Sequence, residues 1–220
     1  MSTTQPCPLC LSRRTKEFFS DRFRKYERCT NCNLIFVPDE FHLSTQDEKS
    51  EYDLHQNSPA DQGYRRFLSR LFEPVNQIVL EEFEKPAEGL DFGSGPGPTL
   101  SVMLEEAGHS MQIYDPFYAP DESVLNRRYD FVTATEVVEH FRQPAQDLHR
   151  LWSLVKPGGV LGIMTKLALD RDAFFGWHYK DDPTHIAFYS RETFEYLSGF
   201  WSAGLEIIGN DVIVMRAPYN

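Results

Sequence analysis

Apolar side chains recur every three or four residues between positions 63 and 84, which is the spacing of one face of an α-helix. Pro74 interrupts this pattern. A proline inside a helix removes one backbone hydrogen bond and clashes with the preceding turn, so we expect two helices that meet near Pro74. The apolar positions that define the face are Phe67, Leu68, Leu71, Phe72, Val75, Ile78, Val79 and Phe83.

From position 88 onward, short apolar runs alternate with helix-like segments. Ser190 is a suitable N-cap for the last helix, and the last two strands flank a Gly209-Asn210 turn that is typical of a hairpin. This alternation predicts an α/β domain with a mostly parallel sheet, helices on both faces and an antiparallel hairpin at its end. The expected strands are 90–92, 110–114, 129–135, 160–165, 205–208 and 212–215, and the expected helices are 98–107, 144–155 and 190–200.

A glycine-rich run follows the first of these strands. It reads Leu90-Asp91-Phe92-Gly93-Ser94-Gly95-Pro96-Gly97 and leads into the expected helix at 98–107. Glycines at alternate positions let backbone N–H groups approach a ligand without an intervening Cβ, and the helix adds the positive end of its dipole. A nicotinamide dinucleotide fingerprint needs a further glycine where Pro98 stands, so the run fits that fingerprint poorly.

The G-x-G-x-G form, opened by Asp91, resembles the first motif of class I S-adenosylmethionine (SAM)-dependent methyltransferases. Segments 129–140 and 154–160 are similar to that family's fourth strand and to the approach to its fifth. The resemblance covers roughly residues 60–215 and implies a Rossmann-like fold and SAM as cofactor. Residues 116–129 are too short for the usual helix plus third strand, so we expect an irregular crossover and leave the adenine contacts there open.

Asp115 ends the second expected strand, 22 residues after Gly93. A carboxylate there can accept hydrogen bonds from both ribose hydroxyls, and the methyltransferase pattern uses this position for that purpose. Asp91 would orient the glycine loop or meet the methionine amino group indirectly. Phe117 or Tyr118 could cover the adenine, and the alternative is that either is a core residue. The residues expected to bind the cofactor are Asp91, Gly93, Ser94, Gly95, Gly97, Asp115, Phe117 and Glu136.

The long loop at 174–189 is aromatic and carries histidines, which suits a lid over an organic acceptor. SAM is already activated, so the protein mainly aligns the acceptor and removes its proton. The candidate catalytic residues are His185, His140 and Glu136. The alternative is a buried loop in which His185 only hydrogen-bonds the backbone.

Glu136-x-x-Glu139-His140, followed later by His185, resembles the divalent-metal site of small-RNA 3′-terminal 2′-O-methyltransferases and of ubiquinone-pathway O-methyltransferases. The resemblance implies that Glu136, Glu139, His140 and His185 hold Mg²⁺ or Mn²⁺. Such an ion could bind two adjacent acceptor oxygens and lower the pKa of the one that attacks. Metal-free members of the superfamily also carry an acidic residue followed by histidine at this point, so a site without an ion stays open.

All four cysteines lie near the N-terminus as Cys7-x-x-Cys10 and Cys29-x-x-Cys32, with eighteen residues between the pairs. This spacing predicts a zinc ribbon in which four thiolates hold a structural ion, with strands at 17–20 and 34–37. Two disulfides are the alternative. The polar start of the chain lacks an apolar secretory signal, which favours a reducing compartment and therefore zinc.

Residues 1–38 thus form the expected ribbon, 39–60 a polar linker or cap without clear periodicity, and 61–220 the methyltransferase domain. A metal-bound ribbon can fold around its ion, so we expect the two modules to have separate cores. Hydrophobic residues make up 41% of the 220 residues, enough for a sizeable core, and no run of about 18 apolar residues predicts a membrane span. We expect a cytoplasmic protein that does not enter a membrane.

The net charge of −11 disfavours nucleic-acid binding over the whole surface. The charge is uneven, because residues 1–37 hold seven Lys/Arg and three Asp/Glu. This basic ribbon is either a solvated face or a docking surface for an acidic partner such as RNA. The function predicted is therefore SAM-dependent O-methylation of a small organic acceptor. RNA methylation and a non-catalytic SAM-binding regulator are the alternatives, and the acceptor and oligomeric state stay open.

Overall fold

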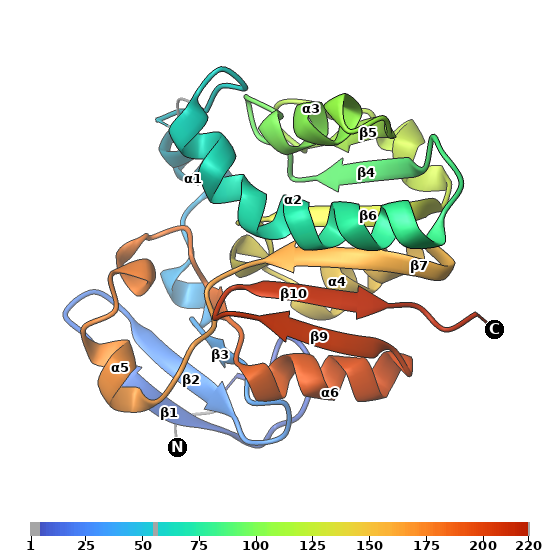
Figure 1. The fold of residues 1–220 in the computed structure, drawn as a ribbon. Coiled ribbons are helices and arrows are strands. Elements are labelled where there is room, and N and C mark those ends of the chain that lie inside the picture. The colour runs from blue at the N-terminus through green and yellow to red at the C-terminus, as the bar shows by residue number, and fades with distance from the viewer. Residues whose placement is uncertain (1–4, 55–56, 220) are drawn as a thin grey trace.

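The computed structural model describes residues 5–54 and 57–219 and contains two β-sheets (Figure 1). Residues 1–4, 55–56 and 220, which belong to the expected ribbon, linker and methyltransferase segments, lie outside the described residues. Within the described ranges, no helix has the length and apolar character needed to cross a membrane. The division into segments 1–38, 39–60 and 61–220 stays a prediction.

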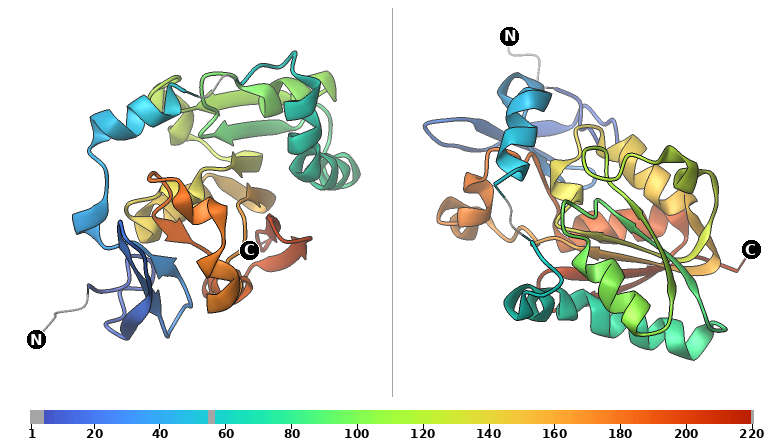
Figure 2. Two further views of the ribbon diagram at one scale, coloured as in Figure 1. Left: turned by 90° about the vertical axis from the view of Figure 1, so that its left-hand side faces the viewer. Right: turned by 90° about the horizontal axis from the view of Figure 1, so that it is seen from above.

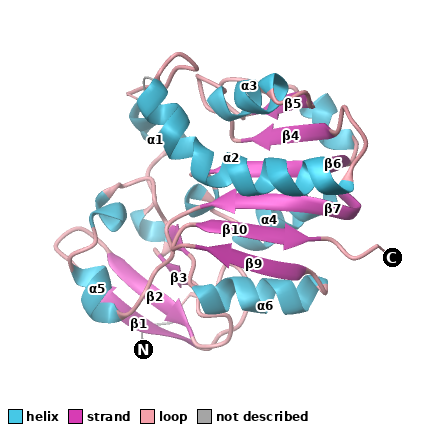
Figure 3. Cartoon of the chain, viewed as in Figure 1, coloured by secondary structure: helices cyan, strands magenta, loops and turns pink. Residues whose placement is uncertain are grey.

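The larger sheet has the strand order β5-β4-β6-β7-β10-β9 (Figure 3). β4 to β7 run parallel to one another, whereas β10 is antiparallel to both β7 and β9. The predicted fold class, a mostly parallel sheet that ends in an antiparallel hairpin, is confirmed. Its strands are β4 (Glu88–Phe92), β5 (Ser110–Tyr114), β6 (Tyr129–Thr135), β7 (Val155–Met164), β9 (Gly204–Ile208) and β10 (Val212–Arg216).

Helices cover both faces of this sheet, and each face has its own buried cluster. α2 and α3 pack on one face, while α4 and α6 pack on the other. The crossover between β5 and β6 contains one 3-10 helix and no strand, as its length predicts. These elements are α2 (Gln62–Glu82), α3 (Thr99–Glu106), α4 (Pro144–Ser153), α6 (Arg191–Trp201) and the 3-10 helix η2 (Glu122–Asn126).

α2 is one continuous helix that contains Pro74, so the expectation of two helices is wrong. Leu71 and Val75, on either side of the proline, are both fully buried in the same cluster. Burial of a side chain of this size contributes about 1.5–3 kcal/mol. Packing along the whole apolar face therefore outweighs the loss of one hydrogen bond at Pro74.

The ribbon forms the second sheet, with the order β1-β2-β3-β8. β1 and β3 are the two strands predicted, whereas the charged strand β2 carries no apolar pattern that would reveal it. β8 comes from the far end of the chain, and Ile35 and Phe36 pair with Phe188 and Ala187. The strands are β1 (Thr15–Ser20), β2 (Lys25–Cys29), β3 (Ile35–Phe36) and β8 (Ala187–Phe188).

The ribbon and the larger sheet share buried clusters, so the expectation of separate cores is wrong. Cys29 and Phe36 belong to the same cluster as Leu161 of β7 and Phe194 of α6. Tyr26 of β2 packs edge-on against Phe174 at 5.2 Å between ring centroids. The reason is β8, which draws the 174–189 loop into the ribbon sheet. The loop begins with α5 (Arg171–Phe175) and η4 (His178–Asp181).

The segment after the ribbon contains a helix that the sequence pattern does not reveal. This helix is α1 (Thr45–Tyr52), and it follows the 3-10 helix η1 (Asp39–Phe41). A further 3-10 helix, η3 (Val138–His140), follows β6 in the larger sheet. α1 has no buried residue, so it lacks an apolar face. Arg142 ties it to the body of the protein through Glu48 at 2.7 Å. Figure 2 shows this helix bridging the ribbon and the glycine-loop end of the sheet.

Candidate active site and cysteine cluster

A pocket of about 840 Å³ opens at the carboxyl ends of β4 to β7. Parallel sheets bind ligands at this end. The pocket brings together most of the residues predicted for the cofactor and for catalysis. Those that line it are Gly93, Ser94, Gly95, Asp115, Phe117, Glu136, His140 and His185.

The glycine loop turns sharply after β4. Gly93 has φ +74° and Gly95 has φ +63°, values that favour glycine. The amide of Gly93 donates to the carbonyl of Tyr114 at 2.7 Å, which fixes the loop against the end of β5. The Oγ atom of Ser94 is buried without a hydrogen-bond partner among the described residues. The loop therefore presents polar groups that a ligand could satisfy.

Gly93→Ala should destabilise the protein by about 1–3 kcal/mol, the scale of a strained backbone conformation. An alanine there would hold a positive φ, and its Cβ would overlap the side chain of Val137. Denaturant unfolding measures the change. Gly176→Ala is the matched control, because Gly176 has φ −91° and open space around it. Equal unfolding midpoints for the two variants would contradict the prediction.

Asp115, directly after β5, lines the pocket beside the glycine loop. One carboxylate oxygen accepts from the amide of Gly95 at 2.9 Å, and the other accepts from the amides of Phe117 and Tyr118 at 2.8 and 3.0 Å. A carboxylate has about four lone-pair sites. Asp115 therefore retains acceptor capacity while it holds the glycine loop in place.

Two of the predicted cofactor residues do not line the pocket. Asp91 is buried beneath the loop and accepts from Thr133 Oγ1 at 2.8 Å, and burial raises the pKa of its carboxyl to about 7. Gly97 lies against the backbone of Asn57, where a Cβ would overlap it. These positions support the loop from behind.

Glu136, at the end of β6, has φ +53°, an uncommon value for a residue other than glycine. Its Oε1 atom is buried and has no hydrogen-bond partner in the described part of the chain. Burial first, and then the charge of Glu139, raise the pKa of Glu136 to about 8. Such outliers cluster at functional sites.

The second wall of the pocket is built around two imidazoles. His140 and His185 lie 4.8 Å apart between ring centroids. The Nδ1 atom of His140 contacts the carbonyl of Thr184 at 3.1 Å, and that of His185 contacts the carbonyl of Tyr179 at 2.7 Å. A carbonyl only accepts, so Nδ1 carries the proton in both rings, and in the neutral ring Nε2 carries the lone pair. Burial lowers the pKa of His185 to about 4, which keeps its ring neutral at pH 7.

Glu139 lies beside these rings and is fully buried. Its Oε1 atom accepts from the Tyr179 hydroxyl, while Oε2 has no partner among residues 5–54 and 57–219. Ligand atoms of Glu139, His140 and His185 all lie within 4.8 Å of one another. Glu136, the fourth ligand predicted, is outside this group.

Two aromatic residues of the pocket are not among the site residues predicted from the sequence. Tyr52 of α1 packs edge-on against His140 at 5.2 Å and tilts against Phe117 at 5.8 Å between centroids. Tyr179 packs against His185 at 4.2 Å. Tyr179 stands in the loop expected to form a lid, but Tyr52 lies in a polar segment that gives no signal.

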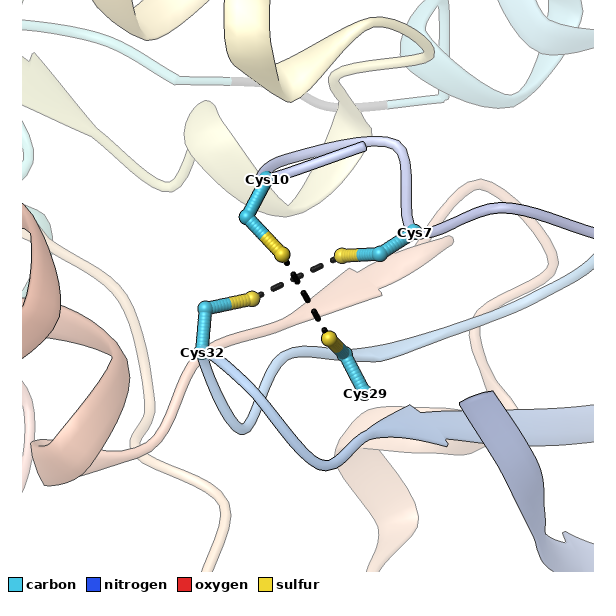
Figure 4. A group of neighbouring side chains, drawn as sticks. All are labelled: Cys7, Cys10, Cys29 and Cys32. Carbon is cyan, nitrogen blue, oxygen red and sulfur yellow. Dashed lines mark hydrogen bonds between the residues drawn. The ribbon is translucent and has the colours of Figure 1, made fainter. Parts of the chain in front are cut away.

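The four cysteine side chains point toward a common centre (Figure 4). The sulfur atoms of Cys7 and Cys32 are 3.5 Å apart, as are those of Cys10 and Cys29. All four are free thiols, and all four sulfurs lie within 4.8 Å of one another. Four sulfurs at about 2.3 Å from one zinc ion would be roughly 3.8 Å apart. The arrangement thus fits a tetrahedral ion and could hold zinc.

The larger sheet except β10, and the helices that cover it, fall within the match to a known protein family. A profile of the methyltransferase-domain family matches residues 60–209, and the chain belongs to that family. The predicted class of enzyme is confirmed. A comparison with curated protein sequences gives no match.

Solved structures with this fold include the magnesium protoporphyrin IX methyltransferase of Synechocystis PCC 6803 with bound S-adenosylhomocysteine (SAH). Its identity to this chain is 12%, the match covers 81% of this chain and 97% of that one, and the TM-score is 0.50. The 1,6-didemethyltoxoflavin-N1-methyltransferase of Burkholderia thailandensis has 15% identity, coverage of 92% and 99%, and a TM-score of 0.49. An O-methyltransferase family protein of the same organism has 18% identity and a TM-score of 0.48. That match covers 81% of this chain, which spans only 61% of that one.

Proposed function

We propose that the chain transfers a methyl group from SAM to an oxygen of a small organic acceptor. The observation that carries the cofactor assignment is the meeting of the glycine loop, the unpartnered Ser94 hydroxyl and Asp115 in one pocket. Backbone N–H groups and a carboxylate suit the amino acid and ribose parts of SAM. When bound, SAM supplies a methyl group on a sulfonium, which needs no further activation. Solved structures that share this fold carry bound SAH or SAM.

Asp115→Ala should weaken the binding of SAH by about 1.5–3 kcal/mol, the scale of losing charge-assisted hydrogen bonds. The variant loses the proposed ribose contact and also the acceptor for the Gly95 amide. Isothermal titration calorimetry measures the change. Asp121→Ala is the matched control, since Asp121 caps η2 at an exposed position. Unchanged SAH affinity of Asp115→Ala would remove Asp115 from the site.

Three groups at one side of the pocket support O-methylation. The neutral imidazoles of His140 and His185 line the pocket, and the unpartnered Glu139 Oε2 adjoins it. A hydroxyl acceptor must lose its proton as the methyl group arrives, and an imidazole Nε2 can take it. His185 would be the base, with His140 and Glu136 beside it. Incubation with cell extract and isotope-labelled SAM tests this. A gain of one methyl on a hydroxyl-bearing metabolite supports it, and methyl gain only on nitrogen or carbon contradicts it.

As an alternative to the base role of His185, we propose that Glu139, His140 and His185 hold a Mg²⁺ or Mn²⁺ ion. Each imidazole is tied at Nδ1 to a carbonyl, the usual arrangement for a histidine that binds metal through Nε2. The unpartnered Glu139 Oε2 adds a hard oxygen ligand. A bound ion would lower the pKa of the acceptor hydroxyl. Titration with Mn²⁺ followed by electron paramagnetic resonance tests for a site that Glu139→Gln abolishes.

We also propose that Cys7, Cys10, Cys29 and Cys32 bind one structural zinc ion. Four thiolates complete a tetrahedral shell and leave no open position for substrate. The docking of RNA or another acidic partner on the ribbon has less support, because Arg24 is buried and Arg28 bonds to Asn33 within the ribbon. Methyl gain on RNA in the labelling experiment would favour that alternative.

A further inference from the structure

Arg24 is a buried cation at the tip of the ribbon hairpin, just before β2, and is 8% exposed. Its guanidinium donates to three backbone carbonyls of the 178–185 segment. The accepting oxygens belong to Lys180, Asp182 at 2.8 Å and Pro183 at 3.2 Å. These contacts join positions more than 150 residues apart in the chain.

The ribbon holds this guanidinium rigidly from the other side. Arg24 Nε donates to the Tyr26 hydroxyl at 2.9 Å, and that hydroxyl donates to Asp21 at 3.0 Å. Asp21 also accepts from the amide of Arg24 at 2.9 Å. A buried charge is costly unless its donors are satisfied, and the planar fork of arginine satisfies several acceptors at once. The side chain is therefore fixed to both parts of the protein.

The carbonyls that Arg24 holds lie in the turn that orients both imidazoles. The Asp182 carbonyl accepts from Arg24 and also from the His185 amide at 3.2 Å. The Asp182 side chain accepts from the Thr184 amide at 2.8 Å, and the Thr184 carbonyl accepts from His140 Nδ1. The same segment supplies the Tyr179 carbonyl for His185 Nδ1. Displacing the turn would move the acceptor of each Nδ1 proton.

We propose that Arg24 is a positioning residue through which the ribbon fixes His140 and His185 in the methyltransferase pocket. The ribbon's contribution to methyl transfer is then mechanical: it holds the turn at 180–183 in one geometry. The inference rests on the proposed function in assigning both imidazoles to the acceptor side. It concerns their orientation, which is measurable without any acceptor.

The test uses the full chain labelled with ¹⁵N-histidine. Long-range ¹H–¹⁵N spectra of the wild type should show His140 and His185 as single Nδ1–H tautomers. Arg24→Ala should shift or broaden the signals of these two rings, because their carbonyl partners lose their fixed position. His109 serves as an internal reference, since its ring bonds to Asn76 of α2.

Arg28→Ala is the matched control. It removes one positive charge, as Arg24→Ala does, but the Arg28 guanidinium contacts Asn33 and Phe18 inside the ribbon. Amide hydrogen exchange at Thr184 and His185 should be at least about tenfold faster in Arg24→Ala, the effect of losing a charge-assisted hydrogen bond. SAH affinity should change less than twofold in both variants, on the order of calorimetric error. If the wild-type protein did not bind SAH, the proposed function would be contradicted. The orientation of the two rings could still be measured.

If Arg24→Ala does not fold, Arg24→Lys replaces it, because lysine keeps the charge but lacks the planar fork. The same two ring signals should then move by a smaller amount. Wild-type signals for His140 and His185 in the folded Arg24 variant would overturn the proposal. Equal perturbation by Arg28→Ala would also overturn it.

Discussion

His185→Ala should lower methyl transfer at least about 100-fold, the usual scale for a lost proton acceptor, while SAH affinity should stay near that of the wild type. The ring lies on the acceptor wall of the pocket, and its Nδ1 is held by the Tyr179 carbonyl. The proposed cofactor contacts are the glycine loop and Asp115, which follow β4 and β5, so SAH affinity should not depend on His185. Steady-state turnover on the acceptor found by labelling, together with calorimetry, measures both quantities. His149→Ala, at an exposed position on α4, is the control.

Chelation separates the two roles proposed for His185. If the ring acts only as a base, a chelator should leave wild-type activity unchanged, provided that zinc analysis shows the ribbon ion is retained. If Glu139, His140 and His185 hold an ion, the chelator should abolish activity and added Mg²⁺ or Mn²⁺ should restore it. Near-wild-type turnover of His185→Ala would contradict both the base role and the metal-ligand role. His185 would then have only a structural role.

Cys29→Ser should abolish binding of the proposed zinc ion and lower the stability of the whole chain. Structural zinc contributes on the order of 10 kcal/mol in zinc-finger peptides, which is comparable to the total stability of about 5–15 kcal/mol of a typical domain. Cys29 belongs to the same buried cluster as β7 and α6. We therefore expect one cooperative transition at a lower temperature, followed by the far-ultraviolet circular dichroism of the helices, and elemental analysis should find no zinc.

Ser20→Ala is the control for this experiment, because Ser20 is exposed at the end of β1. If the two modules were independent, Cys29→Ser would unfold the ribbon while the helical transition and SAH binding stayed at wild-type values. The shared clusters predict that both change. A helical transition at the wild-type temperature in a zinc-free Cys29→Ser protein would contradict the shared core.

The sequence predicts those parts of the fold whose signals are local. β5 and β6 occupy the expected residues because their apolar runs end at turn residues. Ser190 caps α6 as expected, in a reciprocal bond pair with Thr193. β2 and α1 escape prediction because charged and polar residues carry no period there. Pro74 predicts a helix break that does not occur, because tertiary packing of α2 outweighs the local effect of a proline.

The candidate site divides in the same way. Gly93 and Asp115 are close in the structure because parallel strands end at the same edge of a sheet, a rule that can be applied to a sequence. The contact of Tyr52 with His140 and the contact of Arg24 with the 180–183 carbonyls join distant segments. Neither has a local pattern, so only the three-dimensional structure reveals them.

The pairing of β3 with β8 also sets an order of events during synthesis. The other three ribbon strands are synthesised before the methyltransferase domain, yet the fourth is residues 187–188, about 150 residues after β3. Contacts between such distant segments form slowly, because the intervening chain must be ordered first. The two Cys-x-x-Cys segments can come together early. One edge of their sheet stays unpaired until most of the methyltransferase domain, up to residue 188, has been synthesised. The ribbon sheet is thus begun before the methyltransferase domain and is completed only by a strand of that domain.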